Sequence, residues 1–292
     1  MKVLVATDDS DASRAAETLL GALARRDALD IGVLSVLALE PVTPLGYVPG
    51  NERLVWARDE VQQAASRCAE RLGAMGFRTT THDPVEGGAG PSIVRAVEAE
   101  GYGLTVMGAG RHTWLGGILL GSTSRYVVHT SPSAVLVVHE APGEDRPVRV
   151  LLAADGSEAA AEASRTFRAV ADPLRCAVTV VSVAEVPSVS TPVPSARAAL
   201  GEAREAQLET ARRVAAEAME ALVSDGFRAE GTTAVGSPAV VLLGGREPRT
   251  NDLVVVGSRG LGPLQRLRVG SVTDTVVRRS PAALVGPKPS DG

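Results

Sequence analysis

Short apolar runs alternate along the chain with longer segments in which apolar residues recur every three or four positions. A run of about four to eight apolar residues suits a buried strand, and the three-to-four spacing suits a helix with one face against a core. The first half thus has predicted strands at 3–7, 31–39, 77–82, 104–107 and 134–138. Its predicted helices run from 10 or 11 to about 25, from the end of a Pro/Gly-rich loop to about 75, over 92–100, and onward from 122. The second half has strands near 149–153, 177–184, 228–234, 252–256 and 282–285, and a long helix near 196–224. Continuous apolar strands separated by helices predict a parallel sheet covered on both faces.

The pattern occurs twice because the two halves of the chain repeat one another. VLVATDDSDASRAAETLL near the start matches VLLAADGSEAAAEASRTF from Val150, and the segment from Val106 matches the one from Val255. Corresponding positions are Asp8 and Asp155, Gly108 and Gly257, and Ser122 and Ser271. The repeat predicts domains at 1–140 and 148–292, joined by a linker at 141–147 that is polar and contains Pro and Gly. Right-handed crossovers make each an α/β, doubly wound, Rossmann-like domain.

Composition narrows the classes of protein without naming one. The 292 residues leave room for two domains, and 45% apolar with 22% charged residues is ordinary for a globular protein. No window approaches about 18 uninterrupted apolar residues, so no membrane span is expected. The start MKVLVATDDSDAS fits a first strand and not a signal peptide. A net charge of −4 and 3% aromatic residues argue against a nucleic-acid partner. Two isolated cysteines, Cys68 and Cys176, fit buried thiols in a cytoplasmic protein.

Glycines follow the fourth strand of the second half, in VVVGSRGLGPLQRLRVGSVTD. Gly257 and Gly260 allow the backbone to turn and a ligand to approach closely, and Gly270 with Ser271 opens a helix whose free N–H groups suit a phosphate. Two further residues extend this candidate phosphate site: Arg259 adds positive charge, and Asp155 at the end of the first strand could accept from a base amino group or a ribose hydroxyl. An ordinary turn followed by a helix cap explains the same glycines. The loop lacks the lysine of a P-loop and is not a G-x-G-x-x-G motif after the first strand.

The spacing Gly257-x2-Gly260-x9-Gly270-Ser271, with AADGS at the first strand end and RRSPAALV at the last strand, resembles the universal stress protein family. The likeness covers both halves, so the chain resembles a tandem universal stress protein. The resemblance implies a five-stranded parallel sheet, ATP in the crevice and dimer-like pairing through the last strands. It also implies the nucleotide-binding residues of the second half, which are Ala154, Asp155, Val183, Gly257, Arg259, Gly260, Gly270, Ser271, Val272 and Thr273.

The first half departs from the family pattern. Its corresponding residues are Thr7, Asp8, Val36, Gly108, Gly110, Arg111, Gly121 and Ser122. Arg111 stands where the second glycine belongs, and its side chain would either block the ligand or pair with a phosphate. Asp9 replaces the glycine that follows the strand-end aspartate, and two adjacent acids would repel a triphosphate if both faced it. We therefore expect the two halves to differ in nucleotide affinity.

No catalytic constellation is visible in the sequence. The four histidines His82, His112, His129 and His139 lack partners at ligand spacing, so solvated positions and no metal cluster are expected. No general base is placed for an attacking water, although Mg²⁺ could accompany ATP through its phosphates. The sequence thus predicts an ATP-binding stress-response regulator with little or no turnover, which is not an enzyme and forms a homodimer built on an internal pseudo-dimer. Two alternatives stay open: a partner-binding scaffold with one or both crevices empty, and an ATP-consuming enzyme.

Overall fold

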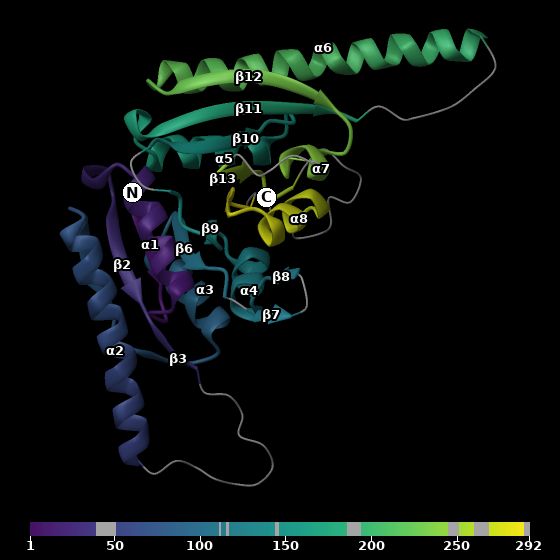
Figure 1. The fold of residues 1–292 in the computed structure, drawn as a ribbon. Coiled ribbons are helices and arrows are strands. Elements are labelled where there is room, and N and C mark those ends of the chain that lie inside the picture. Colours follow the sequence, from purple (N-terminus) through teal and green to yellow (C-terminus); the bar gives the residue numbers. More distant parts are fainter. Residues whose placement is uncertain are drawn as a thin grey trace.

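A computed structural model describes residues 1–38, 51–110, 112–114, 117–143, 146–185, 194–244, 251–259 and 269–288 (Figure 1). One ten-stranded sheet runs through the molecule in the order β12-β11-β10-β13-β14-β9-β6-β1-β2-β4. Each half of the chain contributes five neighbouring strands to it, and within each half all strand pairs are parallel. The predicted class, two tandem doubly wound α/β layers of five parallel strands, is confirmed.

The first half follows the predicted order of elements. Its strands in the main sheet are β1 (Lys2–Ala6), β2 (Asp30–Leu34), β4 (Arg78–Thr81), β6 (Leu104–Gly108) and β9 (Ala134–Val138). Its helices are α1 (Asp11–Leu23), η1 (Arg26–Ala28), α2 (Asn51–Ala74), α3 (Ala89–Glu100) and α4 (Ser122–Thr130). The predicted strand at 31–39 is two strands, because β2 ends at Leu34 and, after Ser35, β3 (Val36–Ala38) pairs with β5 (Val85–Gly87) outside the main sheet. Residue 39 lies outside the described residues. A further short pair, β7 (His112–Trp114) and β8 (Gly117–Leu119), lies between β6 and α4.

The second half repeats this order with fewer interruptions. Its strands are β10 (Val148–Ala153), β11 (Cys176–Ala184), β12 (Arg228–Val235), β13 (Leu253–Val256) and β14 (Ala282–Val285), and its helices are α5 (Glu158–Val170), η2 (Pro173–Arg175), α6 (Pro194–Ser224), α7 (Pro238–Leu242) and α8 (Ser271–Arg279). Serine caps both first helices: the Ser10 hydroxyl accepts from Ser13 N, and the Ser157 hydroxyl accepts from Ala160 N. The short α7 lies where the repeat places a counterpart of the predicted helix at 92–100, but it is only five residues long.

The two halves join through their last strands. β9 and β14 pair antiparallel, from Val135 opposite Val285 to Val138 opposite Ala282. This pairing covers two sheet edges that would otherwise be open to association. The expected internal pairing of the halves is therefore confirmed. The two halves also touch outside the sheet. Ala24 and Ala171, which are equivalent residues at the ends of α1 and α5, form a β-bridge.

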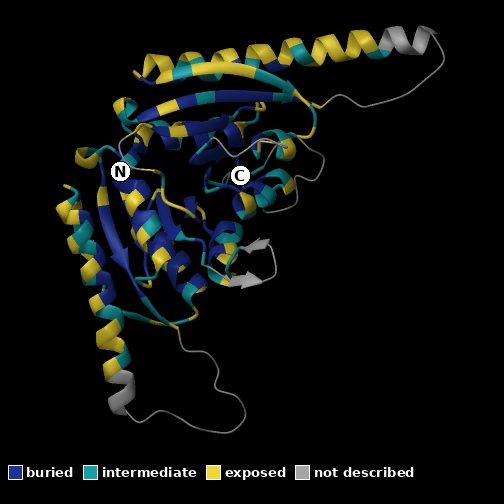
Figure 2. Ribbon diagram, viewed as in Figure 1, coloured by how far each residue is buried: buried dark blue, intermediate teal, exposed yellow. Residues whose placement is uncertain are grey.

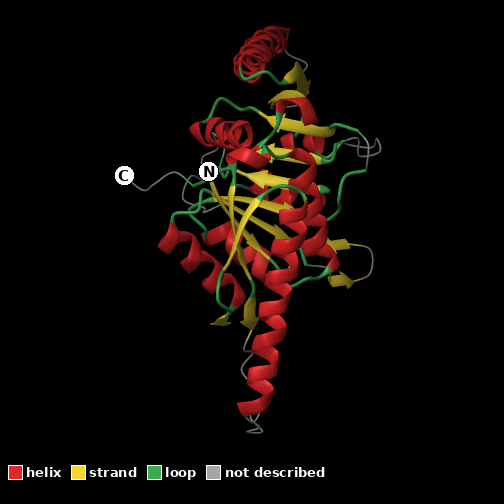
Figure 3. Ribbon diagram, turned by 90° about the vertical axis from the view of Figure 1, so that its left-hand side faces the viewer, coloured by secondary structure: helices red, strands yellow, loops and turns green. Residues whose placement is uncertain are grey.

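Helices cover both faces of the sheet, as Figure 3 shows. One buried cluster packs α1, α2, α5 and α6 against one face, and includes Leu19, Leu20, Phe167 and Phe227. The other packs α3, α4, α7 and α8 against the opposite face, with residues such as Val97, Val127 and Val276. The buried strands form a continuous band between these layers (Figure 2). The core therefore holds the carboxyl ends of all the central strands in fixed positions.

Both cysteines are buried, as the sequence predicts. Cys68 and Cys176 are both buried and unpaired, and burial raises the pKa of the Cys176 thiol to about 12. Across the described residues, no helix combines the length and apolar character that crossing a bilayer requires.

Candidate functional site

A cavity of about 240 Å³ opens beyond the carboxyl ends of β1, β2 and β6. This is the place where the strand order reverses direction, because β1 has β2 on one side and β6 on the other. Doubly wound sheets bind their ligands at such a switch point. Seven of the eight residues predicted for the first half line the cavity: Thr7, Asp8, Val36, Gly108, Gly110, Gly121 and Ser122. The eighth, Arg111, lies outside the described residues.

Asp8 is held at the rim of this cavity by the first turn of α1. Its Oδ1 accepts from Ser10 N at 3.1 Å and from Ser13 Oγ at 2.5 Å. Burial opposes the charged form, but these bonds outweigh it and keep the pKa of the Asp8 carboxyl below its ordinary value. Asp8 therefore presents a fixed carboxylate, which accepts hydrogen bonds from an amino group or a hydroxyl and does not donate one.

Asp9 does not line the cavity, because arginines on two helices hold its side chain. Arg67 Nε donates to Oδ2 at 2.8 Å, and Arg71 Nη2 and Arg14 Nη1 reach Oδ1 at 2.8 and 3.1 Å. The backbone of Asp9 is left-handed, with φ of 58°, and Gly156 at the same place in the second half has φ of 80°. Partial burial opposes ionisation, yet hydrogen bonds from Arg67 and Arg71 lower the pKa of Asp9. Of the two acids expected to repel a triphosphate, Asp9 is therefore neutralised by arginines, and only the charge of Asp8 faces the cavity.

Arg71 also neutralises a carboxylate inside the core, a feature that sequence reasoning missed. Glu17 of α1 is 2% exposed, and Arg71 Nε and Nη2 bind its two carboxylate oxygens at 2.6 and 2.8 Å. The signal in the sequence is a glutamate at a position of α1 that faces the core. The second half has Ser164 and Ala221 at the matching places, so this network belongs to the first half alone.

The glycines after the fourth strands have a packing reason as well as a ligand reason. A Cβ on Gly108 would lie 2.5 Å from the carbonyl carbon of Ala12, and a Cβ on Gly257 would lie 2.7 Å from Ala160 N. Both glycines therefore let the strand end approach the first turn of a helix. Gly110 has φ of +70°, a conformation that favours glycine. The sequence alone attributes all of these glycines to a turn or a ligand.

The N-terminus of α4 faces the cavity without a side-chain cap. Gly121 is the N-cap residue and supplies no side-chain acceptor, so the first amides of the helix are open to a ligand. Ser122, Thr123 and Ser124 line the cavity there, and Ser122 is exposed. Ser124 Oγ is engaged, since it donates to the Gly108 carbonyl at 2.9 Å. Unpaired amides at the positive end of a helix are suited to an anion such as phosphate.

The second half builds the same frame at α8. Gly270 is an N-cap without a side-chain acceptor, its N–H donates to Ser258 O at 3.0 Å, and a Cβ on it would lie 3.8 Å from Arg259 Cα. Thr273 is buried and its hydroxyl donates to the Gly257 carbonyl at 2.7 Å, so only its backbone is available. The structure thus brings together Gly257, Arg259, Gly270 and Thr273, whereas Gly260 lies outside the described residues.

The remaining predicted residues of the second half lie around the end of β10. Asp155 Oδ1 accepts from Ser157 N at 2.9 Å, which repeats the turn at Asp8. Ala154 N donates to Val181 O at 2.9 Å, which fixes the end of β10 against β11. Val183 is half-buried in β11, Val272 packs partly against the core, and Ser271 is exposed at the start of α8.

The histidines correct one expectation. His139 is buried, with Nε2 2.8 Å from the Val277 carbonyl, so the prediction of a solvated side chain is wrong there. The reason is its place directly after β9, where the second half covers it. His82 Nε2 lies 2.6 Å from the Tyr102 hydroxyl. Within the described part of the chain no three His, Cys, Asp or Glu side chains form a group that could hold a metal ion.

Together these features define a class: a duplicated, doubly wound α/β protein in which a helix without a side-chain cap begins at the switch point of each sheet half. The sequence model of the Universal stress protein family matches this chain twice, at residues 1–139 and 148–285. The chain belongs to the universal stress protein family, in a tandem two-domain form.

Relatives agree with this assignment. A universal stress protein of Mycolicibacterium smegmatis is 30% identical over 239 residues, which is 80% of this chain and 77% of that protein. A universal stress protein of Thermus aquaticus is 33% identical over 138 residues, covering 47% of this chain and 95% of that protein. The crystal structure of a universal stress protein from Archaeoglobus fulgidus shares the fold along 99% of this chain and 98% of its own, with a TM-score of 0.68 and 22% identity.

Proposed function

We propose that this protein is a stress-response regulator that binds an adenine nucleotide, ATP, in the crevice of each half. The observation that carries the proposal is the first cavity, where a carboxylate at one strand end and uncapped helix amides at another line one space. Membership in the universal stress protein family supports a role in the response to stress.

Each group has a distinct part in binding. Asp8 or Asp155 accepts from the base or the ribose, since each carboxylate is fixed by a turn at the end of the first strand. The amides at the start of α4 or α8 donate to phosphate oxygens. Arg259 adds a positive charge beside the second loop. Mg²⁺ would bind mainly through the phosphates and water, because the described lining of the first cavity supplies no carboxylate besides Asp8.

The same lining supports slow or absent turnover. A general base needs a pKa near the working pH and a free position beside an attacking water. Asp8 lacks the first property, because hydrogen bonds from the turn keep its pKa below the ordinary value. We therefore propose a binding protein and not an ATPase. Rapid steady-state hydrolysis of ATP by the pure protein would contradict this.

A scaffold that binds protein partners and leaves a crevice empty is the second candidate. Two observations favour it: the first cavity, at about 240 Å³, is smaller than the usual size of about 300–1,000 Å³ for a ligand pocket, and Gly108 and Gly257 are explained by packing alone. Cytoplasmic location, association of two chains and the domain bounds 1–140 and 148–292 stay predictions.

The deciding experiment is to denature freshly purified protein, quantify the released adenine nucleotide per chain, and then titrate the emptied protein with ATP by calorimetry. Two nucleotides per chain mean that both crevices bind. One nucleotide means that one half binds and the other has a different role. No released nucleotide together with no heat on titration would overturn the proposal and favour the scaffold.

Calorimetry also tests the expected difference between the halves. The two crevices differ at the rim. The first half has Asp9, which is bound by arginines, whereas the second half has Gly156 at the same place. We expect two classes of sites, and a single class of two equal sites would contradict the expectation.

A further inference from the structure

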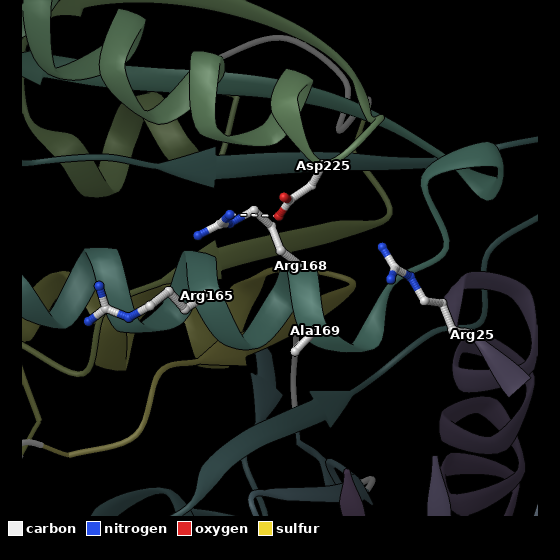
Figure 4. A pocket seen from close by; sticks show the side chains of 5 residues that line it. All are labelled: Arg25, Arg165, Arg168, Ala169 and Asp225. Atoms are coloured by element: carbon white, nitrogen blue, oxygen red, sulfur yellow. Dashed lines mark hydrogen bonds and ion pairs between the residues drawn. The ribbon is translucent and has the colours of Figure 1, made fainter. Parts of the chain in front are cut away.

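A second cavity, of about 360 Å³, lies where the two halves meet. Figure 4 shows the five residues that line it, which are Arg25, Arg165, Arg168, Ala169 and Asp225. Arg25 follows the end of α1, the next three belong to the last turns of α5, and Asp225 lies in the turn between α6 and β12. Helices α1 and α5 lead back to the amino ends of the next strands, so this junction cavity is far from the nucleotide crevices at the carboxyl ends.

Arg25 and Arg168 bring two guanidinium groups to the junction cavity. Arg168 Nη1 donates to Asp225 Oδ2 at 2.6 Å, but Arg168 Nε is buried and has no hydrogen-bond partner among the described residues. Arg25 Nε donates to Ala171 O at 3.0 Å, and Arg25 forms no ion pair within the described part of the chain. A guanidinium carries five N–H donors in a planar fork that matches an oxyanion.

The nearby negative groups are largely occupied. Arg165 pairs with Glu158 and Glu162 on its own helix, so the lining groups that would meet an anion are Arg25 and Arg168, with Asp225 as the carboxylate that competes for Arg168. The last carbonyls of α5 would repel an anion if they were free. Two of them are occupied, because Val170 O accepts from Arg25 N and Phe167 O accepts from Ala171 N.

The duplication supplies an internal comparison. The repeat places Asp172, Thr18, Gly21, Ala22 and Met75 at the positions that match Arg25, Arg165, Arg168, Ala169 and Asp225. At that matching place an apolar side chain fills the space, since Met75 Sδ lies 2.6 Å from where a Cβ on Gly21 would be. The fold therefore does not require arginines at these positions, because none of the matching residues of the other repeat is an arginine.

We propose that the junction cavity binds an oxyanion of the phosphate class, as the free ion or as a phosphate monoester, through Arg25 and Arg168 with Arg165 at its edge. The ligand would bridge α1 of the first half and α5 of the second. This site is separate from the two nucleotide crevices and does not depend on their occupancy.

The test is calorimetric titration with inorganic phosphate at low ionic strength and mildly alkaline pH, after the crevices have been filled with ATP and unbound ATP has been removed. Ala169 is exposed, so A169E adds a carboxylate to the lining with little risk to folding, and A169Q is the control of equal size. We expect A169Q to bind like the unchanged protein and A169E to bind about tenfold or more weakly. D225N, which removes the competing carboxylate, should bind more tightly.

Methyl phosphate is titrated beside inorganic phosphate. Binding of both, each sensitive to A169E, supports the site and assigns it to phosphate monoesters; binding of inorganic phosphate alone supports it and assigns it to the free ion. Equal affinity in A169E and A169Q, or no binding to the unchanged protein, would overturn the proposal. Because the readout compares variants far from the crevices, failure here leaves the ATP proposal intact.

Discussion

A carboxylate placed at the start of α4 should expel nucleotide from the first crevice without unfolding the protein. Ser122 is exposed, lines the cavity and begins a helix whose amides have no side-chain cap. The variant S122E puts a negative charge beside the proposed phosphate position. The N-terminus of a helix favours an acidic side chain by about 0.3–1 kcal/mol, so the fold should be unchanged or slightly more stable.

The expected loss of affinity follows from Coulomb's law. Two unit charges about 4 Å apart interact by about 1 kcal/mol in water and about 4 kcal/mol at an effective dielectric constant near 20. An exposed rim lies between these limits, and about 1.4–3 kcal/mol corresponds to roughly 10- to 150-fold weaker binding. S122Q keeps the size of the side chain without the charge and should lose little.

The assay is an ATP titration of S122E and S122Q, with thermal unfolding of each protein free of nucleotide. S271E and S271Q repeat the comparison at α8, where Ser271 is equally exposed. We expect S122E to weaken one site, S271E the other and the double variant both. If S122E binds ATP as tightly as S122Q while its melting temperature is unchanged, α4 does not hold phosphate and the reasoning fails.

Three further predictions concern what holds the fold together. R71M leaves Glu17 buried without its partner and should lower the free energy of unfolding by about 3 kcal/mol in urea titration; E17Q combined with R71M should recover part of the loss, and an unchanged urea midpoint in R71M would contradict the role of the pair. The pKa of Asp252 is lowered because, although burial opposes its charge, Arg146 binds both of its carboxylate oxygens, at 2.6 and 2.7 Å. Its unfolded pKa is about 3.9, so this stabilisation is complete above that pH and is lost as the pH falls through the lower folded value; acid titration of stability should show a smaller fall for D252N, and equal falls would refute the assignment. G257A places a Cβ 2.7 Å from backbone and should destabilise by about 1–3 kcal/mol, whereas G73A, with no atom within 4 Å of its Cβ, should be neutral or stabilising in the same urea titration.

The sequence was sufficient to predict the architecture, because short apolar runs and helix caps are local signals and both halves of the chain carry them. The apolar run at 134–138 coincides with β9, and the serine caps place the starts of α1 and α5. The short α7 was not singled out from the sequence because its five residues, which begin at Pro238, carry too little periodicity to indicate a helix. The end of β2 at Leu34 was missed because apolar residues continue on the far side of Ser35, and only the pairing of β3 with β5 separates them from the main strand.

The sequence predicted which residues line the candidate site, but it did not predict which of the charged side chains face it. The glycine spacing and the strand-end aspartates identify the residues that line the first cavity. The direction of the Asp9 side chain was not predictable, because its partners Arg67 and Arg71 are 58 and 62 residues away along the chain. No local pattern shows that two arginines of α2 reach this turn. Only the packing of α2 on α1 decides it.

The two halves therefore share a backbone but differ in how each crevice is attached to the rest of the molecule. In the first half an aspartate occupies a left-handed position that costs about 1 kcal/mol relative to glycine, and its ion pairs with Arg14, Arg67 and Arg71 offset that cost while fastening the crevice rim to α1 and α2. In the second half Gly156 needs no such partners, and its nearest neighbour would be Val214 of α6 at 3.4 Å from an added Cβ. A duplicated fold with equal crevices would have no reason to retain a strained aspartate at one rim and a glycine at the other. The two crevices therefore differ in the rim and its connection to the long helix, in addition to the differences among their predicted binding residues, such as Thr7 against Ala154 and Arg111 against Gly260.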